Sequence, residues 1–157
     1  MNFPAADYSL LEMTTRFEWK MLNLPWQAWF SWVHNYADDY TTRKWAASDR
    51  HFQDDPDAYG MGIKVGKNKK KGDWSTSYTY LWEEYASVIR GFTDGFFGGP
   101  NRKGHILRGK YNIDDFLTIR ARVFLTDPIH TNDNNINFSN HNLDQTTTFL
   151  LDLTWKF

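Results

Sequence analysis

The chain contains no cysteine, which excludes disulfide frameworks, thiolate metal sites and cysteine nucleophiles together. Its formal net charge is -1, so it lacks the excess of Lys and Arg that a nucleic-acid surface requires. No run of about 18 apolar residues occurs, and a transmembrane helix is therefore excluded. Length alone decides nothing, because 157 residues also suit one ordinary soluble domain.

Aromatic residues are unusually frequent. They make up 18% of the chain, with eight Trp, eight Tyr and twelve Phe, yet the mean hydropathy is -0.66. A soluble domain with so many large rings normally has abundant Leu, Ile and Val to build a core around them, and these are sparse here. A membrane β-barrel explains how a chain rich in aromatic residues can be hydrophilic on average, because half of each strand faces lipid and half faces water.

Apolar and polar residues alternate with a period of two along most of the chain. In residues 11–21, Leu, Met, Thr, Phe, Trp and Met alternate with Glu, Thr, Arg, Glu and Lys. The same alternation recurs in residues 26–36, 59–66, 74–82, 107–113, 117–125 and 149–157. A tilted strand needs roughly 9–11 residues to cross the hydrocarbon layer, close to the length of these segments. The pattern predicts an all-β fold, an antiparallel up-and-down meander of about seven long strands.

The expected connections alternate between short and long. The short ones are residues 22–25, 67–73 and 112–115, and the long ones are residues 37–58, 85–103 and 127–145. Outer-membrane barrels have short periplasmic turns and long extracellular loops. We therefore interpret residues 1–157 as the C-terminal part of a single transmembrane β-barrel domain.

The charged residues of the expected strands share one face. They are Glu12, Arg16, Glu18, Lys20, Lys64, Glu83, Arg108, Lys110, Arg120, Arg122, Asp152 and Lys156. One interpretation is a water-filled lumen lined by these side chains, whose basic wall favours anions. The other is a solvated face that pairs its charges and selects nothing. The densest basic patch combines Arg120 and Arg122 with Arg108 and Lys110 on the neighbouring strand.

The aromatic rings are expected to form two belts at the membrane interfaces. Trp19, Trp26, Trp74, Tyr111 and Trp155 fall near the short-turn ends, and Tyr36, Tyr59, Tyr80 and Trp82 fall near the long-loop ends.

The last strand resembles the C-terminal assembly signal of outer-membrane barrels, with Leu153, Trp155 and Phe157 at its alternate positions. A family of porins of Gram-negative envelopes is resembled by the motifs Gly91-Phe92-Thr93-Asp94, Phe97-Gly98-Gly99 and Lys103-Gly104-His105 together with the two final hairpins. The resemblance covers nearly the whole chain, as the C-terminal half of that family. This resemblance implies a location in the bacterial outer membrane and passive diffusion of small hydrophilic solutes. The partners it implies are outer-membrane lipid, the barrel-insertion machinery and, as one option, further copies of the chain.

The predicted strand directions imply that the barrel is incomplete. The last strand runs towards the periplasm, and counting back places Met1 outside the cell. Single-chain bacterial barrels have an even number of strands and both termini in the periplasm, whereas seven strands alone form an open sheet. Met1 also begins no recognisable signal peptide. We therefore expect upstream strands and a signal peptide, with an assembly of several chains as the alternative.

No residue set points to catalysis, a cofactor or a metal. Gly-x-Ser-x-Gly is absent, and the five His have no paired spacing. The Asn132–Asn135 segment lacks the ordered spacing of a calcium loop, and Lys69–Lys71 fit a hairpin end better than a nucleic-acid patch.

Two other classes compete with the channel. A soluble aromatic-rich β-sandwich or closed barrel that binds carbohydrate or a small ligand predicts shorter strands and mixed loop lengths. An envelope enzyme built on a barrel scaffold is the third class.

Overall fold

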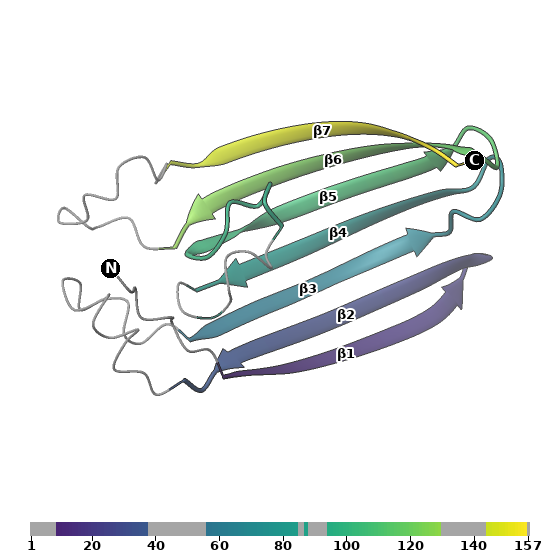
Figure 1. Ribbon diagram of the computed structural model, residues 1–157. Coiled ribbons are helices and arrows are strands. Elements are labelled where there is room, and N and C mark those ends of the chain that lie inside the picture. Colours follow the sequence, from purple (N-terminus) through teal and green to yellow (C-terminus); the bar gives the residue numbers. More distant parts are fainter. Residues whose placement is uncertain (1–8, 38–55, 85–86, 88–93, 130–143, 157) are drawn as a thin grey trace.

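The computed structural model describes residues 9–37, 56–84, 87, 94–129 and 144–156. These residues form one sheet of seven antiparallel strands in sequence order, an up-and-down meander (Figure 1). The strands are β1 (Leu10–Met21), β2 (Leu24–Asn35), β3 (Asp57–Gly66), β4 (Trp74–Glu83), β5 (Arg102–Asn112), β6 (Leu117–Pro128) and β7 (Thr146–Trp155). The predicted fold class and strand number are confirmed.

The strands contain 10 to 12 residues each, the length expected for crossing a bilayer. The connections β1–β2, β3–β4 and β5–β6 lie at one end of the sheet, and the longer connections lie at the other (Figure 1). The β1–β2 turn is the tightest, with Leu22 and Asn23 both at positive φ (53° and 62°). Two consecutive positive φ angles are the signature of the hairpin turn whose twist matches the strands that it joins.

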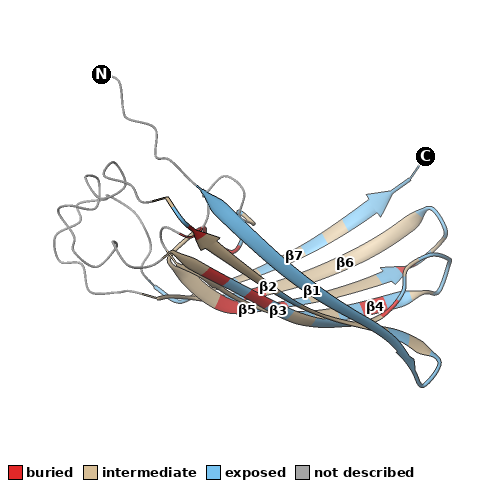
Figure 2. Ribbon diagram, turned by 90° about the horizontal axis from the view of Figure 1, so that it is seen from below, coloured by how far each residue is buried: buried red, intermediate tan, exposed pale blue. Residues whose placement is uncertain are grey.

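Cross-strand pairing joins the apolar positions of all seven strands into one face. One row of paired residues crosses the whole sheet, through Phe17, Ala28, Ile63, Tyr78, Leu107, Val123 and Phe149. Since successive side chains of a strand point to opposite faces, the charged positions lie together on the other face. The sheet is curved (Figure 2). Residues 94–100 lie on its concave side (Figure 1) and pack on Ile106 and Phe124, which have the same parity as Arg108 and Arg122, so the charged face is the concave one.

The sheet is open at both sides. β1 pairs only with β2, and β7 pairs only with β6, so each has an edge with no strand partner among the described residues. Within the described ranges, no helix has the length and apolar character needed to span a bilayer.

Two of the short turns are tied to each other. The carboxylate of Asp73 accepts hydrogen bonds from the backbone N–H groups of Lys69 and Lys70 (2.9 and 3.0 Å). Lys71 donates its backbone N–H to Asp115 (2.6 Å), and its ammonium group lies 3.2 Å from the carboxylate of Asp114. The β3–β4 turn therefore docks on the β5–β6 turn through charged hydrogen bonds.

Acid is expected to weaken this turn contact. The backbone hydrogen bonds from Lys69 and Lys70 lower the pKa of Asp73. The backbone hydrogen bond from Asp115, followed by the side-chain hydrogen bond from Lys71, lowers the pKa of Asp114. A lowered folded pKa stabilises the fold above the unfolded value of 3.8, and this stabilisation is lost as the pH falls through the folded pKa. Urea unfolding in vesicles at pH 6 and pH 3 should show a smaller loss of stability for Asp73→Asn than for the wild type. Equal losses would show that this carboxylate does not hold the turn.

Candidate functional site

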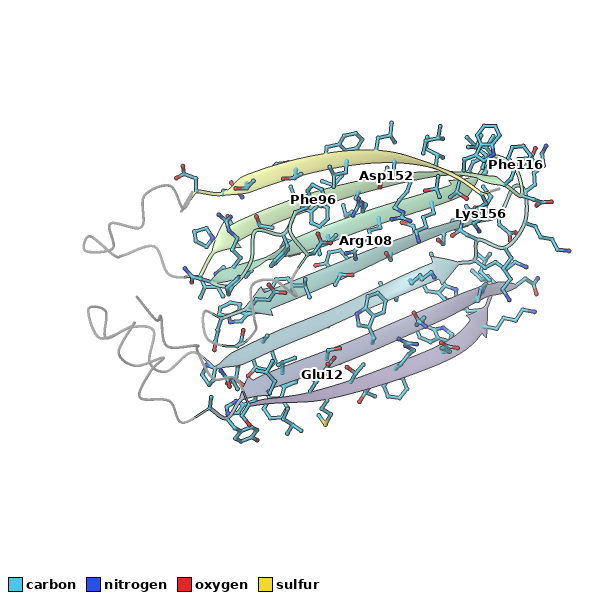
Figure 3. All side chains as sticks on the ribbon, viewed as in Figure 1. Glu12, Phe96, Arg108, Phe116, Asp152 and Lys156 are labelled. Carbon is cyan, nitrogen blue, oxygen red and sulfur yellow. The ribbon has the colours of Figure 1, made fainter. Side chains whose placement is uncertain are left out.

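The charged candidates gather on the concave face (Figure 3). Register places Glu12, Arg16, Glu18, Lys20, Lys64, Glu83, Arg108, Lys110, Arg120, Arg122 and Asp152 on that face, and Lys156 continues the same parity just after β7. The face on which each of these side chains lies therefore agrees with the alternation in the sequence.

Five cations form a basic cluster, namely Lys64, Arg108, Lys110, Arg120 and Arg122. Arg108 pairs directly with Arg122 across β5 and β6, and Lys110 pairs with Arg120. Lys64 lies in the same row of paired residues as Arg108, since Lys64 pairs with Ser77 and Ser77 pairs with Arg108. Like charges placed directly opposite each other destabilise a sheet, so this arrangement is costly unless something negative offsets it.

The acids that contact the basic cluster are fewer than its cations. Asp152 lies 3.0 Å from Arg122, and Asp94 lies 3.8 Å from Arg108. Among the described residues no hydrogen-bond partner reaches the buried Nε atoms of Arg120 and Arg122. Within the described part of the chain, five cations against two acids leave an excess of positive charge.

Residues 94–100 fold back over the concave face, in front of β5 and β6 (Figure 1). Phe97 is fully buried there with Ile106 and Phe124, which pair across β5 and β6. Leu81 and Leu150 pack against these two rings and the Ile106 side chain. This loop segment covers an apolar cluster on a face that is mostly polar.

The same loop segment contacts the basic cluster. The guanidinium group of Arg122 lies 5.5 Å from the centre of the Phe96 ring, and Asp94 faces Arg108. A cation over an aromatic ring is attracted to its negative face. The loop and the basic cluster therefore form one site, in which the loop supplies one acid and one ring.

This loop contact was not predicted. The sequence carries a signal for it in Leu81, Ile106, Phe124 and Leu150, which are apolar residues at polar-face positions. Apolar side chains on a wetted face need a cover, and the adjacent Phe96 and Phe97 in a glycine-rich loop are suited to provide it.

The nine interface candidates lie towards the two ends of the strands. At the short-turn end, Trp19 stacks on Trp26 with ring centroids 6.1 Å apart, and Trp74 pairs with Tyr111. At the long-loop end, Tyr59 pairs with Trp82. Three candidates remain, and the distances given for them join ring centroids. Trp155 lies 5.1 Å from Phe116, at the short-turn end. At the long-loop end, Tyr80 lies 5.2 Å from His105, and Tyr36 lies 4.4 Å from His34.

Part of the expected assembly signal is visible on β7. Leu153 and Trp155 lie on the apolar face and are 66% and 58% exposed. Phe157, the Asn132–Asn135 segment and the three other His (His51, His130 and His141) lie outside the described residues.

A family model described as "Putative porin" matches residues 4–157, nearly the entire chain. The chain belongs to this porin family. Membership supports a porin-like role and agrees with the long antiparallel strands of a transmembrane β-barrel. It favours a channel over an enzyme and suggests an outer-membrane location. No curated protein and no solved structure matches this porin.

Proposed function

We propose that this chain forms one wall of a bacterial outer-membrane channel through which small hydrophilic solutes diffuse passively. The observation that carries the proposal is the division of one seven-stranded sheet into a continuous apolar face and a concave face rich in charge. Family membership supports the same role.

The apolar face is suited to lipid. Phe17, Phe149, Leu151 and Leu153 are each more than 60% exposed, and large exposed rings and aliphatics are spread across every strand. Soluble monomers rarely expose contiguous apolar patches above a few hundred Å². The long strands and alternating connections also disfavour the soluble sandwich, which predicts short strands and mixed loops.

Further strands are expected to complete the wall. Among the residues that the structure describes, β1 and β7 each have an edge without a strand partner, and such an edge would leave backbone N–H and C=O groups unpaired within the hydrocarbon layer, each at a cost of several kcal/mol. We propose that strands of the same polypeptide, upstream of β1, pair with both edges and close the barrel. A barrel closed by several copies of the chain is the alternative.

The basic cluster gives the proposed channel a preference for anions. Fixed positive charge along a narrow aqueous path raises the local anion concentration and lowers that of cations. Residues 94–100 narrow the path beside the cluster, so a passing solute comes close to the uncompensated charges. Diffusion of this kind needs no covalent step, and the side chains act only through charge and hydrogen bonding.

Neutralising two of the cations tests this preference. In the full-length channel, Arg120→Gln with Arg122→Gln should lower the anion-to-cation permeability ratio by about tenfold at low salt, because the net charge of the site falls from three to one. The measurement is the reversal potential in a KCl gradient across a planar bilayer. Lys69→Gln removes one positive charge from an exposed turn and should leave the ratio unchanged. An unaltered reversal potential in the double variant would reject the anion preference.

A further inference from the structure

Trp29 is an aromatic residue on the polar side of the sheet. In the β1–β2 and β2–β3 pairings it shares the concave face with Glu18 and Lys64, opposite to the face that carries the interface aromatics. Its ring lies over Gly62, because a Cβ atom added to Gly62 would come within 2.2 Å of the ring. Backbone covers one side of the ring, and the side chain remains partly exposed on the concave face.

The surroundings of this ring are rich in polar groups. Arg16 lies directly opposite Trp29 on β1, and Lys64 lies two residues beyond Gly62 on β3. Thr79 pairs with Gly62, and its hydroxyl oxygen lies 3.4 Å from a guanidinium nitrogen of Arg108. Neighbouring strands are about 4.8 Å apart, so the flat ring and the edge of the basic cluster lie within the span of one small solute.

We propose that Trp29 is the stacking platform of a binding site for anionic sugars. The apolar face of a pyranose ring would lie on the indole, and its carboxylate or phosphate would point towards Lys64 and Arg108. A flat ring flanked by hydroxyl and cationic groups fits a solute that has an apolar face, several hydroxyls and one negative charge. This assignment rests on the proposed channel function and names the class of solute that the channel favours.

A purely structural role makes a different prediction. An aromatic ring laid over a strand glycine stabilises the sheet by covering exposed backbone. In that case the ring would affect stability and would have no effect on which solute interrupts the current. Solute-dependent block of the channel therefore separates the two roles.

The experiment measures block of KCl current through the full-length channel by glucuronate, glucose 6-phosphate, glucose and acetate. We expect at least one acidic sugar to block at a concentration about tenfold lower than glucose, which can stack but carries no charge, and than acetate, which is charged but cannot stack. A tenfold difference corresponds to about 1.4 kcal/mol for the contact that each control lacks. Block by glucuronate identifies a carboxylate site, and block by glucose 6-phosphate alone identifies a phosphate site.

Trp29→Leu should abolish the advantage of the acidic sugar over acetate while it keeps apolar bulk over Gly62. Trp26→Leu changes a tryptophan on the other face of the same strand and should preserve the difference. If Trp29→Leu fails the heat-modifiable mobility check for assembly, Lys64→Gln replaces it and should weaken block by acidic sugars only.

Two results would overturn the sugar site without affecting the channel. The first is that acidic sugars block the wild-type channel no better than acetate does. The second is that the variants of Trp29 or Lys64 are blocked as strongly as the wild type. A wild-type protein that carries no KCl current would instead reject the channel, and the site with it.

Discussion

Replacing Phe30 with arginine should destabilise the protein in a bilayer by about 2–4 kcal/mol, the cost of a cation on the lipid face near the midplane. Phe30 lies near the middle of β2 on the apolar face and is 37% exposed. In a soluble protein an exposed phenylalanine can become arginine at little cost. The size of the effect therefore reports whether this face touches acyl chains.

Ser31→Arg is the matched control, because Ser31 is the next residue along β2 and lies on the opposite face. Thr14 and Gly60 are its neighbours across the strands, and Ser31 itself is half-buried. Ser31→Arg should change stability by less than about 1 kcal/mol, as lumen substitutions in such barrels mainly tune selectivity. Urea titration of both variants in lipid vesicles gives the comparison. Similar losses in the two would contradict the assignment of faces.

Phe97→Ala is expected to release residues 94–100 from the concave face. Phe97 is fully buried against Ile106 and Phe124, and truncation of a buried phenylalanine costs about 3–5 kcal/mol. Segment 94–100 also contacts the sheet through the 3.8 Å ion pair of Asp94 with Arg108 and through Phe96 beside Arg122. Without its anchor the loop should leave the path, and single-channel conductance in a planar bilayer should rise.

Phe96→Ala provides the control from the adjacent residue. Phe96 is 50% exposed and lies beside Phe124 and Arg122. Its truncation should have a much smaller effect on conductance, because the anchor at Phe97 remains. A Phe97→Ala channel with wild-type conductance would show that the loop does not narrow the path.

The sequence by itself determined the strands, their directions and their two faces. Alternation with a period of two assigns each side chain to a face locally, as in Leu11–Met21, where the apolar and charged residues separate without reference to the rest of the chain. Turn length is also local, so the ends of the sheet followed from the short connections. The charged set that includes Arg120 and Arg122 could be predicted for the same reason.

Only the tertiary structure decided what covers the concave face. The contact of Phe97 with Phe124 joins residues far apart in the chain, and nothing in the local pattern fixes which way a loop of this length folds. The position of the Trp29 ring over Gly62 likewise depends on the exact pairing of β2 with β3. The face of each strand residue follows from its neighbours in sequence. The position of residues 94–100, the position of the Trp29 ring and the excess of cations in the basic cluster depend instead on packing between strands.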